Sequence, residues 1–163
     1  IAKLRDARVI GTASAERQAH ARAAGADFVI DYKTKDVAMV VKELTRGAGV
    51  HGIVDMDVSS TVRLVADGIM SGHGRHVVYG SNATGDIPVP FAQMLWGCLT
   101  MQFMLVYELT AAERDGATAE LTKLLEGGKL KHAIGAKFRL DDIVAAHEAV
   151  EGGRVIGNVV VEM

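Results

Sequence analysis

A small polar turn follows the first predicted strand, Arg8–Ala13, and it holds the residues best suited to bind an anion. Ala13 and Ser14 leave room in this turn, and Arg17 follows one helical turn later. This combination suits a phosphate group, because a guanidinium makes charge-assisted and often bidentate contacts with phosphate oxygens. The alternative is that Ser14 only caps the next helix and that Arg17 is a solvated surface residue. The neighbouring acidic residue Glu16 favours this alternative.

Other reactive side chains lack the partners that catalysis or metal binding would need. Asp55 and Asp57 flank Met56 at a predicted strand end and could form an acid pair or bind a metal. No histidines accompany them at the spacing of metal ligands, so we interpret them as turn and cap carboxylates. Cys98 is the single cysteine and has no adjacent histidine or basic residue to lower the pKa of its thiol. The sequence therefore predicts no catalytic residue and no metal ligand in this chain.

The histidines are interpreted as structural or solvent-exposed residues. His73 and His76 bracket a glycine and an arginine at the start of a predicted strand, and we expect both to face solvent. His147 shares a helical face with Ile143 and Val150, and we expect it to be half-buried by packing.

Strand-like and helical segments alternate along the chain. Each apolar strand is followed by a helix with one apolar face, for example Val58, Val62 and Val65 on one stripe. Thr110 and Glu113 form a capping box at the start of a later helix. Repeated strand–helix units predict an α/β protein with a Rossmann-type doubly wound parallel sheet. The strands are expected at 8–13, 27–32, 51–56, 74–80, 98–106, 136–140 and 157–163.

Composition limits the classes of partner. The 163 residues carry a net charge of −2 and no basic stripe, so we expect no nucleic-acid partner. No apolar run reaches the roughly 20 residues that a membrane-spanning helix needs, so we expect no membrane partner. No signal peptide is visible and the single cysteine excludes internal disulfides, so we expect a cytoplasmic protein.

The chain opens with IAKLRDA, which is typical of the last turns of a helix. We therefore expect an earlier strand and a glycine-rich loop upstream, because a βαβ crossover needs a full helix. GAGVHG at 47–52 follows a helix and precedes a strand, so we interpret it as a connecting loop. If Arg8–Ala13 is the second strand, its end faces the adenosine ribose of a dinucleotide. The lack of an acidic residue there, together with Arg17, then favours a 2′-phosphate.

Several segments resemble one enzyme family in order and spacing, over nearly the whole chain. They are ARVIGTAS, AAGADFVIDY, VHGIVDM, GRHVVYGS, LLEGGKLK and AAHEAVEGGRVIGNVVV. The chain resembles the zinc-independent medium-chain dehydrogenases/reductases of the quinone oxidoreductase, or zeta-crystallin-like, branch. The resemblance implies NADPH-dependent hydride transfer to a quinone or another α,β-unsaturated carbonyl compound.

The resemblance also implies roles for individual residues. Ala13, Ser14 and Arg17 resemble the recognition site for the 2′-phosphate, and Tyr32 resembles a tyrosine near the same phosphate. Gly80 and Ser81 resemble a pair whose backbone passes beside the cofactor ribose and nicotinamide. Phe103 lies in a strand that lines the nicotinamide pocket in the family.

The family likewise implies a domain organisation. Residues 1–128 would be an incomplete dinucleotide-binding domain that lacks its first strand and glycine-rich loop. Residues 129–163, with strands at about 129–139 and 155–163, would return to a GroES-like catalytic domain whose N-terminal part lies outside this sequence. A homodimer through the strand near 98–106 is a further expectation from the family. The alternative function is a non-catalytic nucleotide-binding or interaction module of the same fold.

Overall fold

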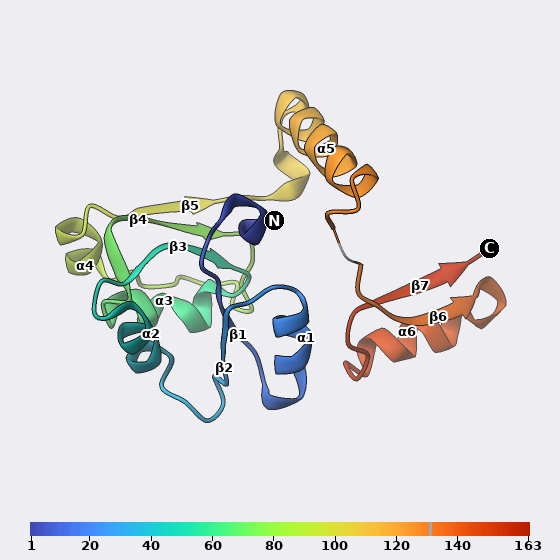
Figure 1. The fold of residues 1–163 in the computed structure, drawn as a ribbon, viewed down its shortest axis with the longest axis horizontal. Coiled ribbons are helices and arrows are strands. Elements are labelled where there is room, and N and C mark those ends of the chain that lie inside the picture. Colours follow the sequence, from blue (N-terminus) through green and yellow to red (C-terminus); the bar gives the residue numbers. More distant parts are fainter. Residues whose placement is uncertain (131) are drawn as a thin grey trace. The chain divides into compact units, whose positions relative to one another are not determined.

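The computed structural model describes residues 1–130 and 132–163, which form two compact units. One unit combines Ile1–Val29 with Ala119–Met163, and the other spans Ile30–Thr118. Strands and helices alternate in both, so the predicted α/β class is confirmed (Figure 1). Within the described residues, the strands form three sheets, which pair β1 with β2, join β3, β4 and β5, and pair β6 with β7.

The first unit begins with a short sheet, and hydrogen bonds to the carboxylate of Asp27 stabilise it. The carboxylate of Asp27 accepts a hydrogen bond from Lys3 Nζ at 2.8 Å and another from the backbone N–H of Val9 at 2.7 Å. Gly25 adopts a positive φ of 106° at the turn after the helix, a conformation that glycine adopts without strain. The elements are a 3₁₀ helix at Ala2–Arg5, β1 at Ile10–Thr12, a 3₁₀ helix at Ala15–Arg17, α1 at Gln18–Ala23 and β2 at Phe28–Ile30.

The C-terminal part of the first unit is a parallel βαβ arrangement. The long helix α5, Ala111–Glu126, leads into it and begins with the expected capping box, in which Glu113 Oε2 accepts from the N–H of Thr110 at 2.9 Å. His147 is exposed, so its predicted half-buried position is wrong, because Ala146 is the residue that α6 buries. The remaining elements are β6 at Ile134–Arg139, α6 at Ile143–Glu151 and β7 at Asn158–Glu162.

The strand expected at about 129–139 is only partly described. Residue 131 lies outside the described residues, and β6 begins at Ile134. β6 pairs with β7 in parallel, with Phe138 opposite Val161.

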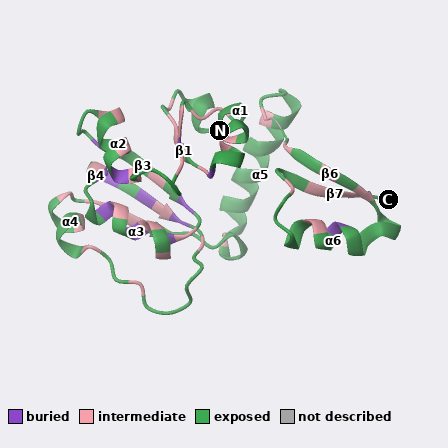
Figure 2. Cartoon of the chain, turned by 90° about the horizontal axis from the view of Figure 1, so that it is seen from below, coloured by how far each residue is buried: buried purple, intermediate pink, exposed green. Residues whose placement is uncertain are grey.

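The second unit holds the larger sheet, in which β4 lies between β3 and β5 and pairs with both in parallel. The apolar stripe predicted on one helix packs on this sheet, and Val58, Val62 and Val78 form a buried cluster. Figure 2 shows buried residues in β4 and α3, where the two elements pack together. The elements of this unit are α2 at Val37–Thr45, β3 at Val50–Asp55, α3 at Val58–Ala66, β4 at Met70–Val78, α4 at Phe91–Trp96 and β5 at Thr100–Phe103.

One helix of this unit has no counterpart among the predicted elements. α4 occupies Phe91–Trp96, and Pro90 stands at its N-cap without a side-chain hydrogen bond. The strand expected at 98–106 is shorter than predicted, because β5 covers Thr100–Phe103 and a 3₁₀ turn follows at Val106–Glu108.

Candidate functional site

The carboxyl ends of the three parallel strands in the second unit meet at one edge of the sheet. Asp55 pairs with Val78 in the β3–β4 register, and Val78 pairs with Phe103 in the β4–β5 register. Gly80 and Ser81 follow β4 after Tyr79, so the structure brings them and Phe103 to the same end of the sheet. In open α/β sheets, ligands bind outside the carboxyl ends of the strands.

The loop after β4 lies against the segment after β3. Tyr79 N–H donates to the carbonyl of Asp55 at 2.9 Å, and Val58 N–H donates to the carbonyl of Gly80 at 3.3 Å. A Cβ atom at Gly80 would lie 2.5 Å from the carbonyl oxygen of Met56. Glycine at this position therefore allows a close approach of two backbone segments, which a side chain would push apart.

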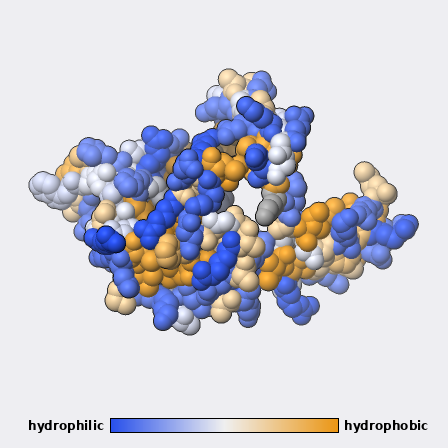
Figure 3. Space-filling model, viewed as in Figure 1, coloured by the Kyte–Doolittle hydropathy of each residue, from blue (hydrophilic) through white to orange (hydrophobic). Residues whose placement is uncertain are grey.

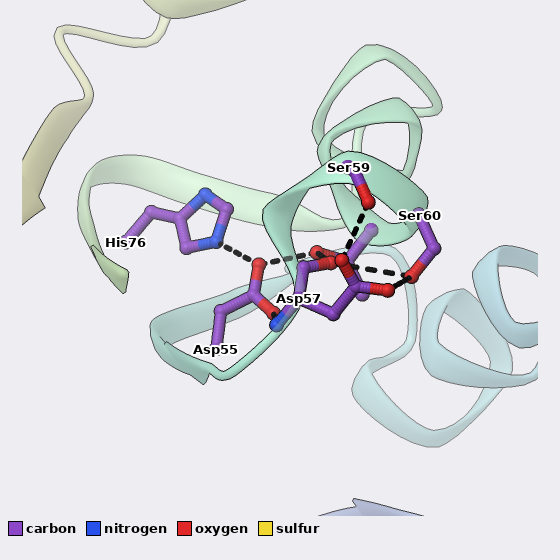
Figure 4. A network of polar contacts seen from close by, with 6 residues as sticks. Asp55, Asp57, Ser59, Ser60 and His76 are labelled. Carbon is purple, nitrogen blue, oxygen red and sulfur yellow. Dashed lines mark hydrogen bonds and ion pairs between the residues drawn. The ribbon is translucent and has the colours of Figure 1, made fainter. Parts of the chain in front are cut away.

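A carboxylate joins the same two loops through four hydrogen bonds. Figure 4 shows those that Asp57 accepts from Ser59 and Ser60. Asp57 Oδ1 accepts from Ser59 Oγ at 2.5 Å and from the backbone N–H of Asn82 at 2.9 Å. Its Oδ2 accepts from Ser60 Oγ and from Asn82 Nδ2, both at 2.8 Å. The Ser59 hydroxyl first, and then the Asn82 N–H and the Ser60 hydroxyl, hold the pKa of Asp57 well below its ordinary value.

A buried histidine–carboxylate pair lies beside this network. His76 is 2% exposed and its Nε2 lies 2.8 Å from Oδ2 of Asp55, which is 4% exposed. The Asp55 carboxylate also accepts hydrogen bonds from the Thr61 hydroxyl and from the N–H of Asp57. The prediction that His76 faces solvent is therefore wrong. The alternation of β4 could have revealed this, because Val78 is buried two residues further along the same strand.

The protonation of His76 follows from its partners. Its Nδ1 is buried and, among the residues that the structure describes, has no hydrogen-bond partner. A carboxylate only accepts hydrogen bonds, so Nε2 carries the proton of this bond and donates to Asp55. His73, by contrast, is exposed as predicted and has a positive φ of 60°.

Asp55 accepts from the N–H of Asp57, as a turn carboxylate does, but it also pairs with His76, which the turn-and-cap interpretation does not include. Asp57 stands at the N-cap of α3, but its side chain makes no capping hydrogen bond to the helix backbone. Across residues 1–130 and 132–163, no group of three or more His, Cys, Asp or Glu side chains is placed to hold a metal ion. In the same residues, every helix is too short or too polar to cross a membrane.

The anion-binding turn predicted after β1 belongs to the first unit. Ser14 is buried and stands at the N-cap of the Ala15–Arg17 turn, but its hydroxyl makes no capping hydrogen bond within the described chain. Ala13 is half-buried, and Arg17 is exposed. Arg17 Nη2 donates to the carbonyl of Gly153 at 2.6 Å. A guanidinium has five N–H donors, so this bond is compatible with a further contact to a phosphate.

Tyr32 follows β2, and it belongs neither to the turn after β1 nor to the group of Gly80, Ser81 and Phe103. Its side chain is exposed. The preceding carboxylate, Asp31, accepts a hydrogen bond from the N–H of Lys33 at 3.0 Å and so shapes its own turn.

Residues 24–161 match a protein family described as zinc-binding dehydrogenase. The chain belongs to this family. The zinc-binding dehydrogenase family is part of the medium-chain dehydrogenases/reductases, which the sequence predicts. A curated relative from a Burkholderia species, a 2-haloacrylate reductase, is 31% identical over 159 residues. The match covers 94% of this chain and 47% of that protein, so the chain spans about half the length of this relative.

Solved structures of this family have the same fold. A mycobacterial quinone oxidoreductase is 27% identical with a TM-score of 0.82, over 97% of this chain and 50% of the other. A mycobacterial protein complexed with NADPH is 26% identical with a TM-score of 0.80, over 99% of this chain and 52% of the other. An NAD-dependent alcohol dehydrogenase is 28% identical with a TM-score of 0.81, over 99% of this chain and 46% of the other. These likenesses confirm the Rossmann-type fold.

Proposed function

We propose that the protein containing these residues is an NADPH-dependent reductase that transfers a hydride to a quinone or another α,β-unsaturated carbonyl compound. These 163 residues would form part of its cofactor-binding portion. The observation that carries the proposal is that Gly80, Ser81 and Phe103 lie together at the carboxyl end of the parallel sheet. A nicotinamide ring is flat and amphipathic, and an exposed aromatic side chain beside a polar loop fits such a ring. Phe103 is 69% exposed, and Ser81 is exposed in the adjacent loop.

The chemistry would come from the cofactor, which supplies the hydride when bound. The residues of this chain would hold and orient it. Gly80 keeps the loop close to the segment after β3, and Phe103 offers an apolar surface to the ring. Catalysis by such a site depends on the alignment of the ring and the substrate, so it requires little acid–base equipment.

The preference for NADPH is proposed from the turn after β1. Ala13 and Ser14 stand where an NAD-binding protein would place an acidic residue, and Arg17 adds a guanidinium nearby. The similar structures include one complexed with NADPH and one named an NAD-dependent enzyme, so the likeness alone does not decide between the two cofactors. Tyr32 is proposed as a further residue near the 2′-phosphate.

The names of two relatives support the substrate class. One is a quinone oxidoreductase and the other a 2-haloacrylate reductase. A quinone and a haloacrylate share a carbon–carbon double bond conjugated with a carbonyl group, so the same hydride acceptor chemistry serves both. We also propose that the protein is cytoplasmic and zinc-independent, and that it forms a homodimer through the region of β5.

Kinetics with the full protein test the proposal. NADPH oxidation is followed at 340 nm with 1,4-benzoquinone and 2-cyclohexenone as acceptors, and NADPH and NADH binding is measured by calorimetry. We expect NADPH-dependent reduction of at least one acceptor and weaker binding of NADH. Binding of NADPH without reduction of any acceptor would favour the non-catalytic module. No binding of either nucleotide would show that the proposed function is wrong.

A further inference from the structure

Asp57 and Asn82 form a clasp between the start of α3 and the loop after β4. Two of the four hydrogen bonds to the Asp57 carboxylate come from Asn82, one from its backbone N–H at 2.9 Å and one from Nδ2 at 2.8 Å. The other two come from Ser59 and Ser60, on the side of the helix. Each oxygen of the carboxylate therefore accepts one hydrogen bond from α3 and one from Asn82.

The clasp acts on the backbone that the proposed function assigns to the cofactor. Gly80 and Ser81 lie between β4 and Asn82, so they are held at one end by the sheet and at the other by the clasp. Ser81 Oγ accepts from the N–H of Ala83 at 3.1 Å, which tightens the same turn. Loops without such anchors sample many conformations, and ordering them costs binding free energy.

We propose that Asp57 and Asn82 are positioning residues for the nicotinamide cofactor, which hold the Gly80–Ser81 backbone in its binding conformation. This inference rests on the proposed function. Neither residue touches the reacting atoms. Their role is to reduce the conformational cost of cofactor binding, so their loss affects the Kd and KM of the cofactor more than kcat.

A charge-swap experiment in the full protein tests this role. Asn82→Asp places two carboxylates face to face and breaks the clasp. Addition of Asp57→Asn restores a complementary pair, because an amide at one position can donate to a carboxylate at the other. We expect the single variant Asn82→Asp to raise the Kd for NADPH by about tenfold or more, within the range for a hydrogen bond to a charged group. The double variant should recover to within about threefold of the wild type.

Ser60→Ala is the matched control. Ser60 donates to the same carboxylate, but it lies in α3 and its bond does not join the helix to the loop after β4. If Asp57 only stabilised the start of α3, Ser60→Ala would weaken NADPH binding as Asn82→Asp does, and the inference would be wrong. We expect the Kd of Ser60→Ala to stay within about twofold of the wild type, since the loop keeps both Asn82 contacts.

Hydrogen exchange separates the failure of this inference from the failure of the proposed function. Exchange at the amide of Asn82 should rise in Asn82→Asp and fall again in the double variant. A wild-type protein that binds neither nucleotide would contradict the proposed function. A wild-type protein that binds NADPH, with equal affinity in Asn82→Asp, would overturn the positioning role alone.

Discussion

Nε2 of His76 lies 2.8 Å from Oδ2 of Asp55, and both side chains are buried in the second unit. The Thr61 hydroxyl and the N–H of Asp57 donate to the same carboxylate. The buried charge of Asp55 is therefore matched by three donors. Such an arrangement fixes one relative position of β3, β4 and the start of α3, since any other position would leave polar groups unpaired.

Asp55→Ala should destabilise the second unit strongly. Among the described residues, the change leaves His76 without a partner at either ring nitrogen, and it leaves the Thr61 hydroxyl with the carbonyl of Asp57 as its acceptor. We expect a loss of about 3–5 kcal/mol in the free energy of opening of β3 and β4, the range for a broken buried pair. Hydrogen exchange of the strand amides in the full protein measures it. Asp86→Ala, at an exposed carboxylate of the loop after β4, should change the same free energy by less than about 0.5 kcal/mol.

The contact between Gly80 and Met56 predicts a steric effect. Gly80→Ala adds a Cβ atom 2.5 Å from the Met56 carbonyl oxygen, so the loop after β4 must move away from the segment after β3. We expect a cost of about 1–3 kcal/mol, typical of overpacking, together with weaker NADPH binding. Gly85→Ala is the control in the same loop, because a Cβ atom there meets no atom within 4 Å. Equal effects of the two variants would show that the close contact is unimportant.

Arg17→Ala should distinguish the two nicotinamide cofactors. If the guanidinium binds the 2′-phosphate, its loss weakens NADPH binding by about 1.5–3 kcal/mol and leaves NADH binding nearly unchanged. Calorimetry with both nucleotides measures the difference, and Arg22→Ala, at an exposed position of α1, is the control. An equal loss for NADPH and NADH would show that Arg17 stabilises the protein through Gly153 and does not read the phosphate.

The hydrogen bonds that the Asp27 carboxylate accepts predict that stability depends on pH. The hydrogen bond from Lys3, followed by that from the Val9 N–H, lowers the pKa of Asp27 below its ordinary value of 3.8. Because the pKa of Asp27 is lower in the folded than in the unfolded chain, these hydrogen bonds stabilise the fold above about pH 4. This stabilisation is lost as the pH falls below 3.8, towards the folded pKa.

Carboxyl titration by NMR checks this prediction. Lys3→Ala should raise the pKa of Asp27 towards 3.8, but not fully, because the Val9 N–H still donates to it. Lys33→Ala, at an exposed lysine beyond β2, should leave it unchanged. An unchanged Asp27 pKa in Lys3→Ala would contradict the assigned cause.

The sequence predicts the regular elements well where their pattern is local. The stripe of Val58, Val62 and Val65 has helical spacing, and all three residues are buried in α3. α4 was not predicted because it has six residues, no polar N-cap side chain, and an apolar surrounding that also fits a strand. Pro90, directly before its first residue, gave a weak signal, since proline favours the beginning of a helix.

In the candidate site, too, the sequence indicates single residues but not the pairs that tertiary contacts bring together. The roles proposed for Gly80, Ser81 and Phe103 come only from resemblance to a family, and the parallel register places the three residues together. The pairs Asp55–His76 and Asp57–Asn82 were missed because each joins residues more than 20 positions apart. Each side chain alone fits a turn or a surface, and only the pairing of β3 with β4 brings the partners together.

The sheet of the second unit predicts how the 163 residues behave when produced alone. β3 and β5 are both edge strands, and Val54 in β3 is 80% exposed. Hydrophobic side chains also reach the surface on the face seen in Figure 3. Exposed apolar edges invite pairing with other chains. We expect the isolated chain to associate or to melt without cooperativity, and to bind NADPH much more weakly than the full protein, as light scattering, calorimetry and thermal unfolding would show.

Val54→Lys tests the cause of this behaviour, because a charge on an exposed edge strand opposes association. In the isolated chain the change should increase solubility. In the full protein we expect the change to lower the free energy of unfolding. An additional strand would cover the edge of β3 there, and burying the charge would be costly. Ala66→Lys, at an exposed position of α3, controls for the added charge. A soluble, cooperatively melting monomer with micromolar NADPH affinity would contradict the prediction, and would mean that these residues need no further strand beside β3.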